Sequence, residues 1–116
     1  INTGHVEAPI YVEMDGHLVN PKIELYVEGE LYQTVKVTTE IAEYEKLLYD
    51  TRENQFFIGK QNTDGTRVSL FSLDYIDFYN DNVIRLPKNK SCEIKLTADN
   101  EVLNAKLTIY PRYKAV

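Results

Sequence analysis

The sequence predicts an all-β chain folded as an antiparallel β-sandwich. Apolar and polar residues alternate with a period of two along most of the 116 residues, and helical periodicity is nearly absent. Turn-forming residues recur about every 8–12 positions, which indicates about eight to ten short strands. A hydrophobic content of 43% suffices for a buried core, so we expect one β-sandwich domain over residues 1–116.

The first strands follow from this alternation. Residues 9–14 ("PIYVEM") place three apolar side chains on one face, Ile10, Val12 and Met14. Asp15-Gly16 then supplies a turn dipeptide of the kind that hairpins use. Residues 22–28 alternate in the same way, with three inward positions, Ile23, Leu25 and Val27. Both segments are therefore predicted to be strands with one buried face.

Residues 28–30 are predicted to form a three-residue hairpin loop. The resulting register sets Ile23 opposite Val35, so that the apolar side chains of the two strands share one face. The same register makes Tyr26 and Tyr32 cross-strand neighbours on the outer face.

The middle of the chain contains further strand signals. Strands are expected near residues 45–50, 55–60, 66–71 and 83–87, with a turn at 61–65 and a stop at Pro87. Residues 72–79 ("SLDYIDFY") fit either a short helical turn or irregular chain.

The last two strands are predicted to pair through a tight turn at Asp99-Asn100. This pairing sets Cys92 opposite Leu107 on the buried side, and Glu93 opposite Lys106 on the outer side. The opposite-charge pair is worth roughly 0.2–1 kcal/mol. Cys92 then acts as a small hydrophobe rather than a reactive thiol, and a single cysteine excludes an internal disulfide.

Charge and hydropathy argue against several kinds of partner. The net charge is −5 and the 13 Lys and Arg are scattered, which argues against nucleic acid. No apolar run approaches the ~20 residues of a membrane-spanning helix, so no membrane is expected either. Because the chain begins at Ile1 rather than Met, we expect it to belong to a longer protein.

The two histidines raise the question of a metal site. Three acidic residues lie between His5 and His17, namely Glu7, Glu13 and Asp15. A zinc site needs three or four converging ligands, and the two histidines do not have the HExxH or a similar spacing. Backbone roles for Gly4 and Gly16 are the favoured alternative, so no metal or cofactor is predicted.

Catalytic signatures are missing from the sequence. Asp74 with Asp77, or Asp50 with Glu53, could pair as a hydrolase does, but solvated surface is the default for scattered acids. No GxSxG, P-loop or GxGxxG motif occurs. The sequence therefore predicts no catalytic residues and no enzyme; two buried acids facing one cleft would revive a hydrolase.

The tyrosines suggest one binding site. Tyr26 and Tyr32 could form a flat platform for a sugar ring, with Glu24 and Thr34 beside them for hydrogen bonds. The alternative is an ordinary cross-strand aromatic pair that stabilises the sheet by roughly 0.2–1 kcal/mol.

Five segments occur in the order found in one known family. They are "NTGHVEAP" at 2–9, "NPKIEL" at 20–25, "EKLLYDTREN" at 45–54, "VIRLP" at 83–87 and "LTIYPRYKAV" at 107–116. Over nearly its whole length the chain thus resembles the C-terminal domain of the distal tail protein (Dit) of long-tailed phages. The matching positions are Asn2, Gly4, Pro9, Asn20, Pro21, Asp50, Leu86, Pro111 and Tyr113. The chain departs from the family at "PKNKS" (87–91), where the family has glycine and asparagine after the leucine.

The resemblance implies a galectin-like, jelly-roll type of sandwich. It also implies an N-terminal half that makes the full-length protein a homo-hexameric ring under the tail tube. The C-terminal domain of such a phage or prophage protein docks other tail, baseplate or receptor-binding proteins. It is assembled in the cytoplasm of the host bacterium and resides in the virion tail. The alternative is a lectin-like carbohydrate-binding module that recognises host cell-surface glycans.

Overall fold

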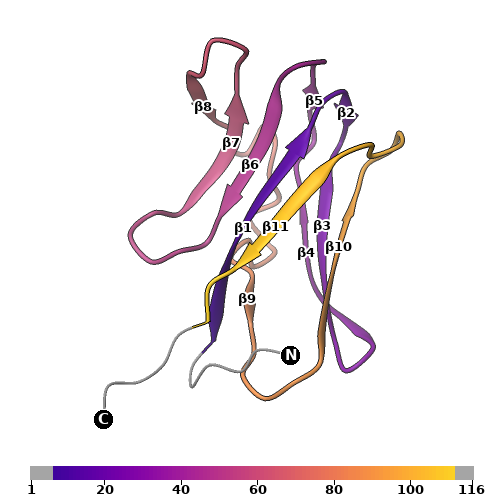
Figure 1. Cartoon of the computed structure of the whole chain (residues 1–116), viewed down its shortest axis with the longest axis vertical. Coiled ribbons are helices and arrows are strands. Elements are labelled where there is room, and N and C mark those ends of the chain that lie inside the picture. The colour runs from indigo at the N-terminus through magenta and orange to yellow at the C-terminus, as the bar shows by residue number, and fades with distance from the viewer. Residues whose placement is uncertain (1–6, 112–116) are drawn as a thin grey trace.

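The structure is a computed structural model that describes residues 7–111. These residues form eleven β-strands and no helix, which confirms the predicted all-β class (Figure 1). Within the same residues no helix is long and apolar enough to cross a membrane. The strands are β1 Ala8–Asp15, β2 Leu18–Val19, β3 Lys22–Val27, β4 Glu30–Lys36, β5 Glu40–Ile41, β6 Lys46–Asp50, β7 Phe57–Gln61, β8 Arg67–Ser69, β9 Arg85–Leu86, β10 Cys92–Thr97 and β11 Ala105–Ile109.

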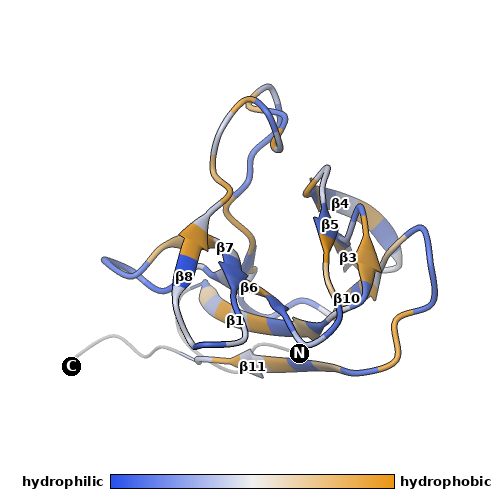
Figure 2. Ribbon diagram, turned by 90° about the horizontal axis from the view of Figure 1, so that it is seen from above, coloured by the Kyte–Doolittle hydropathy of each residue, from blue (hydrophilic) through white to orange (hydrophobic). Residues whose placement is uncertain are grey.

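Two antiparallel sheets share one core. The larger sheet has the order β11-β1-β6-β7-β8, with β9 also paired to β1, and the smaller sheet has the order β10-β3-β4. Strands β2 and β5 form a separate pair. Figure 2 shows the larger sheet curving round one side of the molecule, with β3, β4 and β10 on the other side. One buried cluster contains side chains from both sheets, among them Ile10, Val12, Ile23 and Leu25.

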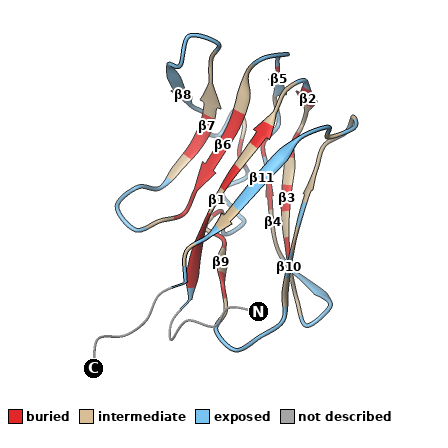
Figure 3. Cartoon of the chain, viewed as in Figure 1, coloured by how far each residue is buried: buried red, intermediate tan, exposed pale blue. Residues whose placement is uncertain are grey.

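Strand β1 has the two faces that the sequence predicts. The three apolar residues of its inner face are fully buried, namely Ile10, Val12 and Met14. On the opposite face the Tyr11 hydroxyl donates a hydrogen bond to Glu13 Oε1 at 2.9 Å. Figure 3 shows the buried strands β1 and β6 in the middle of the larger sheet, beside the exposed edge strand β11. The alternation therefore fixes which side of β1 meets the core.

The β3–β4 hairpin keeps the predicted register only at the end far from its turn. Ile23 lies opposite Val35, as predicted. The register then shifts just before Tyr26, whose cross-strand partner is Leu31. The predicted pairing of Tyr26 with Tyr32 is therefore wrong.

The turn of this hairpin has two central residues rather than the predicted three. Val27 pairs with Glu30, which leaves Glu28 and Gly29 in the turn with φ angles of 51° and 83°. Two positive φ angles are typical of a type I′ turn, whose twist matches that of the paired strands. A β-bulge then takes up one residue, so the apolar faces come back into register.

Strands β10 and β11 lie in different sheets, so the predicted closing hairpin is wrong. Strand β10 pairs with β3, and β11 pairs with β1. The predicted pair of Glu93 with Lys106 is therefore wrong as well. Glu93 Oε1 lies 3.8 Å from Lys95 Nζ in the same strand, whereas Lys106 lies opposite Glu13 of β1. Cys92 lies opposite Val27 and still packs against the core, as its predicted buried side requires.

Asp99 and Asn100 contact the segment around β2 instead of turning the chain back. The Asp99 N–H donates to the Val19 carbonyl at 2.8 Å, and Asn100 Oδ1 accepts from the Val19 N–H at 3.0 Å. Asn100 Nδ2 donates to the His17 carbonyl at 2.9 Å. Because these contacts satisfy the polar groups, residues 98–104 can cross from the smaller to the larger sheet.

Asp15-Gly16 ends β1 without closing a hairpin. The chain passes from there through β2 to β3 in the opposite sheet. The Gly16 N–H donates to the Glu45 carbonyl at 2.8 Å, and a side chain at position 16 would collide with the Ala42 carbonyl. Gly16 therefore serves close backbone packing, which confirms the role predicted for it.

The other predicted strands are present with shifted ends. Strands β6, β7, β8 and β9 correspond to the segments predicted near 45–50, 55–60, 66–71 and 83–87. The turn predicted at 61–65 joins β7 to β8. Residues 72–79 contain no strand and no continued helix. The Ile76 N–H donates to the Ser72 carbonyl at 2.9 Å, which closes a single helical turn, and the rest of the segment is irregular, so each of the two predicted alternatives holds for part of it.

Candidate functional site

The two tyrosines of the predicted platform are not paired across the strands. Lys95 Nζ lies over the ring of Tyr26 at 4.5 Å from its centroid, and the Tyr26 hydroxyl donates to Glu24 Oε2 at 3.5 Å. Tyr32 is 64% exposed and is the bulge residue, which the strand register leaves without a cross-strand partner. Thr34 lies opposite Glu24. Of the four predicted residues, Tyr32 and Thr34 line hollows of the surface.

Tyr32 lies between two adjoining hollows, which together we call the β4 groove. The larger hollow, of about 630 Å³, is lined by Glu7, Tyr32, Gln33, Asp81, Val83 and Arg85. The smaller hollow, of about 300 Å³, is lined by Leu31, Tyr32, Gln33, Thr34, Asn80 and Asp81. Tyr32, Gln33 and Asp81 line both hollows, so the two adjoin each other along β4. Its opposite wall is the segment that leads into β9.

That opposite wall is held by two buried side chains, Tyr49 of β6 and Thr51 directly after that strand, which we call the clamp. The Tyr49 hydroxyl donates to the Asn82 carbonyl at 2.6 Å and accepts from the Ile84 N–H at 2.8 Å. Thr51 Oγ1 donates to the Ile84 carbonyl at 2.8 Å and accepts from the Ile10 N–H at 2.9 Å. Burial raises the pKa of Tyr49, which keeps its hydroxyl protonated. Residues 82–84 are thus held by hydrogen bonds from side chains, where a β-strand would be held by backbone pairing.

The polar side chains of the β4 groove are oriented by hydrogen bonds to the backbone. Asp81 Oδ1 accepts from the Val83 N–H at 2.9 Å, and Gln33 Nε2 donates to the Val83 carbonyl at 3.1 Å. Arg85 Nη2 donates to the Thr51 carbonyl at 3.4 Å. Arg85 Nε is buried and has no hydrogen-bond partner among the described residues. A guanidinium has five donors, so most of those of Arg85 are not used by the described part of the chain.

The connection between β8 and β9 exposes large apolar side chains. Leu73 is 82% exposed and Tyr79 is fully exposed. The ring centroids of Phe71 and Phe78 are 4.7 Å apart, and those of Phe56 and Phe71 are 5.3 Å apart, in edge-to-face contacts. Phe56, directly before β7, joins the exposed residues of this connection through its contact with Phe71. Together we call these residues the aromatic surface, namely Phe56, Phe71, Leu73, Phe78 and Tyr79.

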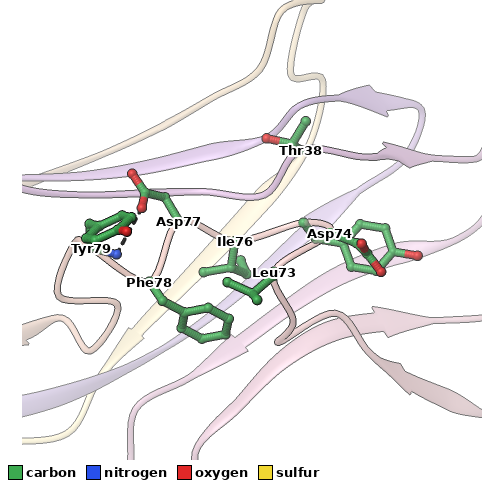
Figure 4. Close-up of a pocket in the computed structure, with 8 residues that line it drawn as sticks. Thr38, Leu73, Asp74, Ile76, Asp77, Phe78 and Tyr79 are labelled. Atoms are coloured by element: carbon green, nitrogen blue, oxygen red, sulfur yellow. Dashed lines mark hydrogen bonds between the residues drawn. The ribbon is translucent and has the colours of Figure 1, made fainter.

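A hollow of about 470 Å³ lies within this connection. Figure 4 shows a row of apolar side chains along it, those of Leu73, Ile76 and Phe78. Asp74 and Asp77 flank the row, and Asp77 Oδ1 accepts from the Tyr79 N–H at 2.9 Å. The Thr38 N–H donates to the Tyr75 carbonyl at 2.8 Å, which ties the connection to the chain after β4.

The residues considered for metal and thiol chemistry are placed as follows. His17 Nε2 lies 2.8 Å from Glu40 Oε1, and His5 lies outside the described residues. Within residues 7–111 no three His, Cys, Asp or Glu side chains come together to hold a metal ion. The Cys92 thiol lies 3.5 Å from the Lys90 carbonyl, and burial raises its pKa, which disfavours the reactive thiolate.

The acid pairs considered for hydrolysis are separated by their surroundings. Asp50 is buried and binds Arg52 through both carboxylate oxygens, with the shortest distance 2.7 Å from Arg52 Nη2 to Asp50 Oδ2. Its partner in the proposed pair, Glu53, is exposed. Asp74 and Asp77 are both exposed beside the aromatic surface. Neither pair therefore places two buried acids across one cleft.

Sequence reasoning missed the aromatic surface, although the sequence carries a signal for it, and it named Tyr32 and Thr34 of the β4 groove only as part of the tyrosine platform. Residues 71–81 ("FSLDYIDFYND") combine aromatic and acidic residues without a strand period, which is the pattern of an exposed apolar segment. The residues of the opposite wall of the β4 groove left no signal, because the contact between Gln33 and Val83 joins residues 50 positions apart.

Comparisons of the chain with models of protein families, with curated proteins and with solved structures give no match.

Proposed function

We propose that the chain is a non-catalytic docking domain of a phage tail, the C-terminal, galectin-like domain of a distal tail protein. The observation that carries this proposal is the aromatic surface, where Leu73 and Tyr79 are almost wholly exposed. Clusters of exposed apolar side chains mark protein–protein contact sites, and aromatic residues are enriched in such sites. The partners are other tail or baseplate proteins.

The attachment of this connection to the core supports docking. Ile76 is buried in the core cluster and Tyr75 packs against it, while Asp74 and Asp77 on either side are exposed. Asn82, near the end of the connection, is buried, and Nδ2 of its side chain donates to the Asp77 and Asn80 carbonyls at 3.1 and 3.2 Å. A surface that is ordered before binding loses less conformational entropy when a partner covers it.

The positions that match the phage family also support the proposal, because those described here have structural rather than chemical roles. Asn20 has a positive φ of 48°, which asparagine tolerates better than most residues. Pro21 and Leu86 are buried, and Asp50 forms the ion pair with Arg52. In this chain these positions shape the scaffold, which suits a structural hub.

Phage particles and the full-length gene product provide the test. We expect the full-length protein to form a six-membered ring in native mass spectrometry and negative-stain electron microscopy. We also expect an antibody raised against this chain to label the distal end of the tail. A monomeric full-length product, or particles whose tail tips stay unlabelled, would overturn the proposal.

The aromatic surface itself is tested by a double substitution, Leu73→Ser with Tyr79→Ser. Both side chains are exposed, so the fold is retained while apolar contact area is lost. Tails assembled with this variant are expected to lack the component that docks on the domain. The matched control is Tyr44→Ser, since Tyr44 is 80% exposed outside the aromatic surface. Normal tails from the double variant would show that docking uses another face.

A second candidate function is recognition of host cell-surface glycans. The β4 groove favours it, because an exposed tyrosine lies beside a carboxylate, an amide and a guanidinium. The original platform of Tyr26 with Tyr32 lacks the direct cross-strand pairing on which it was based, since Tyr26 lies opposite Leu31.

A further inference from the structure

The β4 groove has features that the docking proposal does not use. It runs beside Tyr32, whose side chain is 64% exposed. Asp81, Gln33 and Arg85 line the same hollow. We propose that this groove binds a neutral oligosaccharide, with the Tyr32 ring against one sugar ring and the three polar side chains on its hydroxyl groups. The inference gives a site to the second candidate function, glycan recognition, on which it rests, and it does not depend on the docking proposal.

The chemistry of the lining fits a sugar better than a purely apolar or ionic ligand. A sugar ring presents an apolar face of C–H groups, which an exposed tyrosine ring covers, and a rim of hydroxyl groups. Each hydroxyl both donates and accepts, so it can use a carboxylate acceptor, an amide and a guanidinium donor at once. The Asp81 carboxylate has one oxygen on the Val83 N–H and a second oxygen without a partner in the described residues.

The charge of the groove favours a neutral ligand. Arg85 is the cationic side chain of the larger hollow, and Asp81 and Glu7 line the same space with negative charge. The whole chain carries a net charge of −5. An anionic ligand is therefore repelled over most of the lining.

The dimensions of the groove favour an oligosaccharide over a single sugar. The two hollows of about 630 and 300 Å³ each fall within the range of about 300–1,000 Å³ that is usual for small-molecule sites. Tyr32 and Asp81 line both of them. A ligand with linked rings can thus occupy both sides of Tyr32 in one binding mode.

The wall opposite Tyr32 is fixed before a ligand arrives. The clamp residues Tyr49 and Thr51 hold Ile84 through its N–H at 2.8 Å and its carbonyl at 2.8 Å. Gln33 Nε2 donates across the groove to the Val83 carbonyl at 3.1 Å. A preorganised wall lowers the entropy lost on binding, which matters for weak ligands such as sugars.

A titration followed by ¹H–¹⁵N NMR tests the proposal with lactose, maltotriose and chitotriose as probes at millimolar concentrations. We expect at least one probe to shift the amide signals of Tyr32 and Gln33 and of residues 80–85. Tyr32→Ala should weaken that binding about tenfold, because the stacking ring is lost. Tyr32→Phe keeps the ring and should weaken it less. The dispersion of the same spectra shows that each variant is folded.

Two control variants separate this groove from other surfaces. Tyr26→Ala, which removes the ring covered by Lys95, should leave binding unchanged. The double variant Leu73→Ser with Tyr79→Ser should also bind the sugar normally, so a failure of the docking proposal is distinguishable from a failure of this one. The inference is overturned if no probe shifts these signals, if the shifts gather on the aromatic surface, or if Tyr32→Ala binds as the parent does. Tighter binding of the acidic probe sialyllactose than of the neutral probes would overturn the neutral ligand class.

Discussion

Replacing Tyr49 by phenylalanine tests the clamp that supports the opposite wall of the β4 groove. The phenol oxygen accepts from the Ile84 N–H at 2.8 Å and donates to the Asn82 carbonyl at 2.6 Å. Tyr49 is fully buried, so water cannot take its place. An unpaired buried N–H costs about 1–3 kcal/mol, and the carbonyl, which tolerates a lost partner better, adds about 1 kcal/mol. We therefore expect Tyr49→Phe to lower the free energy of unfolding by about 2–4 kcal/mol.

Urea unfolding followed by far-ultraviolet circular dichroism measures this loss. The midpoint should fall while the denaturant slope stays the same, because the surface exposed on unfolding hardly changes. At about 4 °C per kcal/mol for a domain of this size, the melting temperature should fall by about 8–16 °C. The matched control is Tyr44→Phe, where the side chain is 80% exposed. It should stay within about 0.5 kcal/mol of the parent.

The pH dependence of stability gives an independent check of the same hydroxyl. Burial raises the pKa of Tyr49, so above the ordinary ionisation range of tyrosine only the unfolded chain releases this proton. The free energy of unfolding of the parent therefore falls as the pH rises through that range. Tyr49→Phe should fall less steeply. A variant within about 0.5 kcal/mol of the parent, with the parent's pH slope, would refute the reasoning.

Three further substitutions test other contacts. Thr51→Val keeps the shape of the buried side chain but removes its hydroxyl, so urea unfolding should show a loss of about 1–3 kcal/mol; parental stability would contradict the clamp. Hydrogen bonds from the Thr66 hydroxyl and N–H hold the pKa of Asp64 below its ordinary value. Carboxyl-carbon NMR should show Thr66→Val raising that pKa, and the stability that the bonds contribute should vanish as the pH falls through the lowered value. Gly29→Ala should cost about 1 kcal/mol in urea unfolding, because φ is 83° there, and Gly29→Asn less; equal costs would argue against the type I′ turn.

The faces of single strands could be predicted because they depend on neighbours in the sequence. Ile10, Val12 and Met14 are separated by two positions each, so any extended backbone puts them on one side. The pairing of Ile23 with Val35 was predictable for a related reason, since a hairpin brings together residues that are close in the chain. The bulge before Tyr26 was not, because a two-residue turn with one bulge aligns the same apolar faces as a three-residue loop.

The partners of the last two strands could not be predicted from alternation. Strand β10 shows an inner face whether it pairs with β3 or with β11, and the sequence of Asp99-Asn100 suits a turn in either case. Bonds from these two residues to Val19 and His17, more than 75 positions earlier, decide the crossing. Only the assembled sheets bring those groups within reach.

By itself, the sequence determined the all-β class, the buried faces of β1 and β3 and the turn between β7 and β8, because each depends on local alternation or turn chemistry. The tertiary structure alone decided which strands share a sheet and where Tyr32 finds its polar neighbours. The contact of Gln33 with Val83 spans 50 positions, and the hydrogen bond from Tyr49 to Asn82 spans 33. Such contacts form only when the two sheets close on a common core, since burial of that core fixes the path of the chain between them.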